Sequence, residues 1–168
     1  VGGSTTPAAR RASVRMRMNE VPLWAWISVV CKFAESTTVR SLYPYVSSLA
    51  DMLGVSPEAV ALCISLKEVG YAAMPVFGPY LTACAGAGGP VSVRVGAGLA
   101  LAACSLLIGA VNSFAVFAVA VLLIGAVKSL AEVGTQMMVT AFTARDDRGR
   151  TVAVIELAWG LSSLVGVP

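Results

Sequence analysis

Five long apolar stretches alternate with short polar segments along most of this chain. The pattern predicts helices over about 22–46, 57–83, 93–111, 114–143 and 151–168. A helix needs about 20 mainly apolar residues to cross a hydrocarbon core about 30 Å thick. The sequence therefore predicts an all-α fold, a polytopic bundle of transmembrane helices, and we expect the last helix to be truncated at Pro168.

Local signals refine some of these helices. Pro44 should loosen the far end of the first helix, because proline has no N–H to donate. The sequence Ser56-Pro57-Glu58 is typical of a helix start, with a capping hydroxyl, a proline in the first turn and an acid near the positive dipole end. Small residues four apart favour close helix contacts in lipid. Such pairs are Gly98 with Ala102 and Gly125 with Ser129.

The first 19 residues differ from the rest, since they are rich in Ser, Thr and Ala and contain four arginines but no acid. We expect residues 1–19 to form a disordered, basic cytoplasmic tail. An organelle transit peptide has a similar composition and is the alternative.

Composition supports a membrane protein. Hydrophobic residues make up 57% of the chain and charged residues 12%, about half the charged fraction of an ordinary soluble domain. The net charge of +3 does not indicate nucleic acid, because the basic residues form no stripe with interleaved aromatics. With no histidine and four well-separated cysteines, we expect no metal site, disulfide or cofactor.

The basic residues predict the orientation. Cytoplasmic loops carry an excess of Lys and Arg. Placing the N-terminus in the cytoplasm puts eight basic residues inside and none in the two external turns. These eight are Arg10, Arg11, Arg15, Arg17, Arg94, Arg145, Arg148 and Arg150. A plasma membrane is favoured over an organelle, although the basic tail permits both.

Three lysines fall far inside apolar helices. Lys32 and Lys67 each lie ten residues after the proline that starts the helix, about 15 Å into the membrane at 1.5 Å per residue. Lys128 lies fourteen residues into the fourth helix. Three helices therefore place a cation near the midplane.

Each lysine has a carboxylate nearby in sequence. Glu35 follows Lys32 by three residues, so the two can pair on one helix face. Glu132 follows Lys128 by four, with the same expectation. Glu68 follows its lysine directly and lies about 100° around the helix, so we expect it to pair with another helix.

Ionisable side chains at mid-membrane cost about 2.5–3.5 kcal/mol each on insertion scales, so several of them indicate an interior face or a wet cavity. They form either a substrate or proton pathway or a set of ion pairs that locks the bundle. We favour the pathway, because transporter sites lie near the midplane. Its candidate residues are Lys32, Glu35, Arg40, Lys67, Glu68, Lys128 and Glu132.

Several short segments then occur in a familiar order. They are RSLYPYV at 40–46, LGVS at 53–56, FGP at 77–79, DRGR at 147–150, IE at 155–156, WG at 159–160 and GVP at 166–168. Their order resembles the first half of a major facilitator superfamily transporter, especially the drug-efflux-like members. The resemblance covers residues 22–168.

The resemblance implies the N-terminal half of a twelve-helix fold, with a missing C-terminal half beyond Pro168. It implies a secondary transporter of small organic solutes that works by alternating access and is coupled to protons or another ion. The lipid bilayer and a small-molecule substrate are the implied partners. By the same resemblance, the cytoplasmic loop and gate contain Arg94, Asp147, Arg148, Arg150 and Glu156.

Two positions depart from the family pattern. The loop after the second helix, residues 78–90, contains no acid and is followed only by Arg94. Val121 stands where the family usually has an arginine. The alternative is therefore a non-transporting membrane subunit or receptor-like relative. A membrane enzyme is not expected, because no nucleophile motif such as G-x-S-x-G is present.

Overall fold

The computed structural model describes residues 21–84, 89–110 and 112–165. This part of the chain contains six α-helices, one 3-10 turn and no strand, so the all-α prediction is confirmed for it. The helices are α2 Leu23–Arg40, α3 Val46–Leu53, α4 Pro57–Cys84, α5 Gly89–Ala110, α6 Phe114–Phe142 and α7 Arg148–Val165, with the turn η3 at Arg145–Asp147. The tail expected over 1–19 lies outside the described residues.

The first predicted helix is interrupted. We expected it over 22–46, but α2 ends at Arg40 and residues 41–45 form turns before α3 begins. Pro44 accounts for the break, because it cannot donate a helical hydrogen bond. The short α3 replaces part of the expected turn and ends at Gly54, whose φ of 65° suits glycine.

The start of α4 agrees with its signals. The Ser56 hydroxyl accepts a hydrogen bond from the Ala59 N–H at 3.3 Å, as a capping residue does. The helix then runs through Pro75 and Pro79 to Cys84 without interruption.

Two other helices begin earlier than predicted. Helix α5 starts at Gly89 instead of residue 93, and α7 starts at Arg148 instead of residue 151. Both starts were predicted too late, because the glycines at the start of α5 and the charges at the start of α7 are typical of loops. As a result Arg94 lies in the second turn of its helix and not at its start, and Arg150 lies on a helix and not in a loop.

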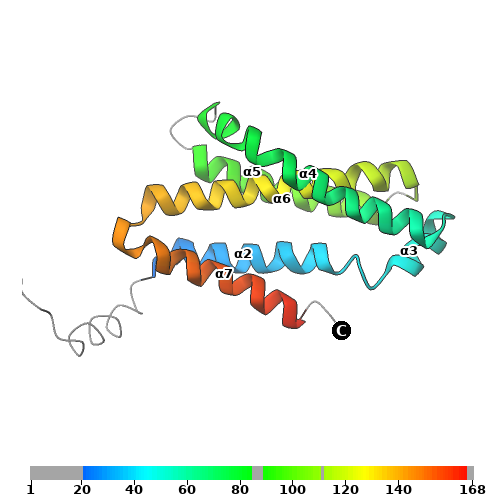
Figure 1. The fold of residues 1–168 in the computed structure, drawn as a ribbon, viewed down its shortest axis with the longest axis horizontal. Helices are drawn as coiled ribbons and strands as arrows, with labels where there is room; N and C mark the ends of the chain where they lie inside the picture. The colour runs from blue at the N-terminus through cyan, green and yellow to red at the C-terminus, as the bar shows by residue number, and fades with distance from the viewer. Residues whose placement is uncertain (1–20, 85–88, 111, 166–168) are drawn as a thin grey trace, which may run out of the picture.

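The helices form two groups along one long axis (Figure 1). One group contains α4, α5 and α6, in which α6 packs against both α4 and α5. The other contains α2 and α7, which pack side by side and run in the same direction. Contacts of α2 with α5 and α6, and of α7 with α6, join the groups.

Apolar side chains form two small cores. One joins α3, α4 and α6 through Ala50, Val60, Ile64, Phe117 and Val121. The other joins α2, α5 and α6 through Val39, Leu101 and Ile124. Val121, at which the resemblance implies an arginine, is thus a fully buried packing residue.

Glycine permits the closest helix contact. A Cβ on Gly125 would overlap the backbone of Lys67, and a Cβ on Gly70 would overlap the carbonyl of Leu122, so α4 and α6 meet backbone to backbone. The expectation for Gly125 is confirmed. The one for Gly98 is wrong, because a Cβ there would meet no atom within 4 Å.

Three of the described helices are long and apolar enough to span a membrane, with the qualifying stretches at 57–78, 89–110 and 114–142. The other two long helices, α2 and α7, each carry three charged side chains. Several of these charges contact one another or neighbouring helices.

Candidate functional site

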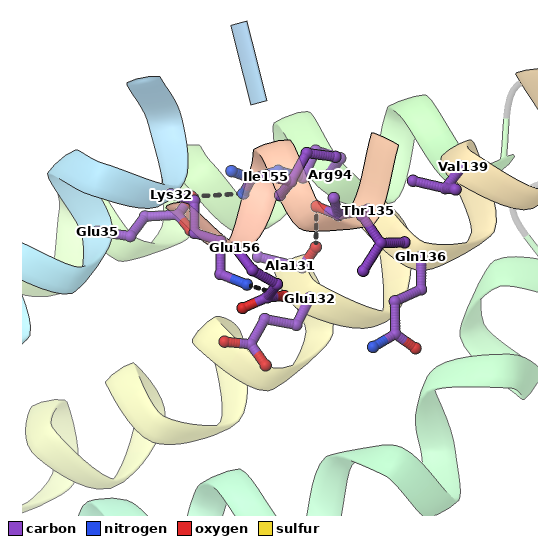
Figure 2. Close-up of a pocket in the computed structure, with 11 residues that line it drawn as sticks. Lys32, Glu35, Arg94, Ala131, Glu132, Thr135, Gln136, Val139, Ile155 and Glu156 are labelled. Atoms are coloured by element: carbon purple, nitrogen blue, oxygen red, sulfur yellow. Dashed lines mark hydrogen bonds and ion pairs between the residues drawn. The ribbon is translucent and has the colours of Figure 1, made fainter. Parts of the chain in front are cut away.

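Five charged side chains gather around a cavity of about 100 Å³ between α2, α5, α6 and α7. They are Lys32, Glu35, Arg94, Glu132 and Glu156. Thr135 and Gln136 of α6 add neutral polar groups. Figure 2 shows these side chains converging from the separate helices.

The first ion pair in the cavity joins α2 to α7. Lys32 Nζ lies 2.6 Å from Glu156 Oε1. The lysine side chain is 12% exposed and the glutamate 55%. The expected pairing of Lys32 with Glu35 is therefore wrong, because α7 packs along α2 and supplies a carboxylate from across the interface.

The second ion pair joins α2 to α5. Arg94 Nη1 donates to Glu35 Oε1, and both residues are buried. From the sequence, we predicted that Arg94 is a surface charge in a cytoplasmic loop. That placement is wrong, since α5 begins five residues before Arg94 and carries it into the bundle.

Glu132 and Lys128 do not form the expected ion pair. The hydroxyl of Tyr71 on α4 donates a hydrogen bond to Glu132 Oε2. Lys128 Nζ lies 5.9 Å from the centroid of the same tyrosine ring. Tyr71 thus contacts both charges, and among the described residues no carboxylate lies within ion-pairing distance of Lys128.

Lys67 is buried and has three contacts. Its Nζ donates to the Tyr43 hydroxyl at 2.8 Å and lies 4.8 Å from the centroid of that ring. It also pairs with Glu68 Oε1 at 3.1 Å. The expectation that Glu68 pairs with another helix is wrong, because its flexible and largely exposed side chain reaches the adjacent lysine.

Arg40 lies at the other end of α2 and contacts α7. Its guanidinium stacks over the Trp159 ring at 4.9 Å and donates to the Ser163 hydroxyl. Arg40, Lys67, Glu68 and Lys128 do not line the charged cavity. Of the seven pathway candidates, three therefore line the cavity and four do not. The three are Lys32, Glu35 and Glu132.

The cytoplasmic loop candidates also divide. Arg148 holds the end of α6, since its Nη2 donates to the Thr140 carbonyl at 2.8 Å and its Nε to the Thr143 carbonyl at 3.3 Å. Asp147 and Arg150 line a separate cavity at the α6–α7 turn. Glu156 lies in the charged cavity, where Lys32 holds it.

A second, mostly apolar groove of about 460 Å³ adjoins the buried ion pair. It runs between α2 and α5 and is lined by residues such as Ile27, Val95 and Leu99. Glu35 and Arg94 line both the groove and the charged cavity. The ion pair therefore belongs to the lining of both.

The cavity suits the binding of a polar or charged solute. It holds three carboxylates and two cations, and each cation is paired with a carboxylate. Among the described residues, no three His, Cys, Asp or Glu side chains come close enough to hold a metal ion.

Several contributors were missed from the sequence. Tyr71 follows Lys67 by four residues and Gln136 follows Glu132 by four, so each shares a helix face with a predicted site residue. That spacing was the available signal. No local signal points to Tyr43, because the turn after α2 brings it to Lys67.

The family comparison decides the class of protein. A family model described as Major Facilitator Superfamily matches residues 25–168. The chain belongs to the major facilitator superfamily. It is thus part of a membrane transporter family, and its apolar helices are those of a multi-pass integral membrane protein in a lipid bilayer.

Searches of curated proteins and of solved structures found no match to this major facilitator superfamily chain. The family match covers the helices that carry the charged cavity. The drug-efflux-like subtype stays a prediction.

Proposed function

We propose that this chain is the N-terminal half of a secondary transporter that moves small organic solutes by alternating access, coupled to protons or another ion. The observation that carries the proposal is the charged cavity enclosed by α2, α5, α6 and α7. Ionisable groups inside a membrane are expensive, and they mark substrate and ion pathways.

The charges beside the cavity support the same proposal. Lys128 of α6 has an aromatic contact, and Arg40 of α2 contacts Trp159 and Ser163 of α7. In the proposed transporter, the cations attract an anionic group of the solute and a glutamate exchanges a proton.

The proposal includes partners and an orientation. Alternating access needs two halves that move about a central site, so we propose a second half beyond Pro168. We also propose a cytoplasmic N-terminus in a plasma membrane. The charge asymmetry supports this orientation without Arg94, because seven basic residues remain inside and none lies in the external turns.

A non-transporting membrane subunit is the second candidate. It is favoured by residues 78–90, which contain no acid where the family has an acidic residue in its signature loop. Such a subunit would keep the bundle and its ion pairs while carrying no solute.

The experiment is an uptake assay in proteoliposomes with the full-length protein and a panel of labelled amino acids, sugars and organic ions. We expect at least one solute to be taken up, and the K128A variant to lose that uptake while its membrane expression stays normal. The R145A variant is the matched control, because Arg145 is exposed and lies away from the cavity.

Retention of uptake by K128A would contradict the assignment of Lys128 to the pathway. Absence of uptake for the whole panel, with a second protein recovered as a stable partner, would favour the subunit.

A further inference from the structure

Most charges in the centre of the bundle have a partner of opposite sign. Lys32 pairs with Glu156, Arg94 with Glu35, and Lys67 with Glu68. Among the described residues, one carboxylate in the cavity, Glu132, has no cation within ion-pairing distance. Lys128 is the cation nearest to it along α6 and is likewise without a carboxylate.

The two unpaired groups lie on the same face of one helix. They are four residues apart, which separates their Cα atoms by about 6 Å along the α6 axis. Lysine and glutamate at this spacing can pair directly. Here Tyr71 contacts both, with its hydroxyl on Glu132 and its ring near Lys128, and so takes the place of a direct bond.

Both groups keep unused hydrogen-bonding capacity. An ionised carboxylate offers about four acceptor sites, and the structure gives Glu132 one donor, from Tyr71. An ammonium carries three donors, and the contact of Lys128 is with a ring face. Both side chains are only half-buried, so a ligand in the bundle centre can reach them.

Charges of both signs surround the two groups. Lys128 interacts electrostatically with Glu132 and Glu68 as well as with Lys67 and Arg40. Glu132 lines the cavity that contains Glu35 and Glu156, and each of these two carboxylates is paired with a cation. Figure 2 shows Glu132 beside Glu156, with no interaction drawn from Glu132 to another of the cavity residues.

We propose that Lys128 and Glu132 together bind a zwitterionic solute of amino-acid type. The acid group of the solute contacts Lys128 and its protonated amine contacts Glu132, while Tyr71 holds the two protein groups apart. This inference rests on the proposed function and names the substrate class of the same site.

Solutes with a single charge fit this arrangement less well. A plain anion at Lys128 lies near the carboxylate of Glu132, and a plain cation at Glu132 lies near the ammonium of Lys128. Unlike charges attract and like charges repel strongly at such distances in a partly buried site. A zwitterion satisfies both groups, so the site discriminates by repulsion as well as by attraction.

The test measures binding to the purified full-length protein in lipid nanodiscs. The probes are alanine and leucine, their N-acetyl derivatives, which are anions, and their methyl esters, which are cations. We expect at least one free amino acid to bind ten times more tightly than both of its derivatives.

Variants assign the two contacts. K128A should lose the preference for the amino acid over its ester, and E132Q the preference over its N-acetyl derivative. Y71F keeps the ring but loses the hydroxyl, so it should weaken amino-acid binding severalfold. The double variant K128E/E132K exchanges the charges and should recover part of the binding that each single variant loses.

Three results would overturn the inference. The first is that K128A and E132Q weaken the binding of the amino acids, the N-acetyl derivatives and the esters equally. The second is that an ester or N-acetyl derivative binds more tightly than its amino acid. The third is that no probe binds to the folded protein. An amino acid that binds but is not taken up by proteoliposomes would overturn the proposed transport and leave this inference standing. Uptake of singly charged solutes without uptake of any amino acid would overturn this inference and leave the proposed transport standing.

Discussion

Gly125 of α6 lies against the backbone carbonyl of Lys67 of α4, and no side-chain carbon fits between them. This contact sets the distance between two helices that both carry charges. It also brings Tyr71, one turn after Lys67, to Lys128 and Glu132 on α6. Helix packing and the charged centre therefore depend on the same glycine.

The G125A variant should be destabilised. The added Cβ would overlap the Lys67 backbone, which cannot rotate away as a flexible side chain can. Overpacking of this kind costs about 1–3 kcal/mol of unfolding free energy. Thermal unfolding of the purified protein in detergent would show the loss as a lower midpoint.

The G98A variant is the matched control, because a Cβ at Gly98 would meet no atom within 4 Å. In a helix alanine is favoured over glycine by about 1 kcal/mol, so G98A should be neutral or slightly stabilising. Equal loss in both variants would contradict the close contact at Gly125.

Removing the arginine of the buried ion pair should be costly. R94A leaves Glu35 buried among the helices without its cation. Breaking a buried pair by removing one partner costs about 3–5 kcal/mol, mostly from the uncompensated charge. A lower yield of folded protein and a lower unfolding temperature are the expected readouts.

The double variant E35A/R94A removes both charges and should be more stable than R94A alone. If the unfolding free energy lost in E35A/R94A equalled the sum of the losses in E35A and R94A, the ion pair would not explain the instability of R94A.

The other ion pair in the cavity should respond unequally to its two deletions. E156A leaves Lys32, whose side chain is 12% exposed, without a partner, while K32A leaves Glu156, which is 55% exposed. We expect E156A to lower the unfolding free energy by about 1–3 kcal/mol and K32A to lower it by less than about 1 kcal/mol.

Unfolding of the two variants in the same detergent would compare them. The exchange variant K32E/E156K should recover stability relative to E156A. The opposite order of the two single variants would show that the contact between α2 and α7 does not shield Lys32 as the structure indicates.

Arg148 should stabilise the end of α6. Its guanidinium donates to the carbonyls of Thr140 and Thr143, which lie in and just after the last turn of the helix. Losing these two bonds in R148A should cost about 0.5–1.5 kcal/mol per bond. Faster amide hydrogen exchange over residues 138–143 would detect the fraying. R145A is the control and should leave exchange there unchanged, because Arg145 is exposed.

Much of the architecture could be predicted from hydropathy alone. The positions of α4 and α6 follow from long apolar runs with clear ends, such as the Ser56 cap and the polar pair before Phe114. The starts of α5 and α7 were predicted less well, because the glycines around Gly89 and the charges around Arg148 are typical of loops.

The residues of the charged centre could also be predicted, but not their partners. Spacing along one helix paired Lys32 with Glu35, whereas the folded chain pairs each of them with a different helix. Sequence spacing carries no information on which helices become neighbours. The same limit applies to Arg94, whose role depends on α2 lying beside α5.

The Glu35–Arg94 pair belongs to the walls of two compartments, the charged cavity and the apolar groove between α2 and α5. The two compartments therefore share these side chains. Loss of either residue would change the lining of both. A transport defect in such a variant would therefore combine a change in the charged cavity with a change in the apolar groove.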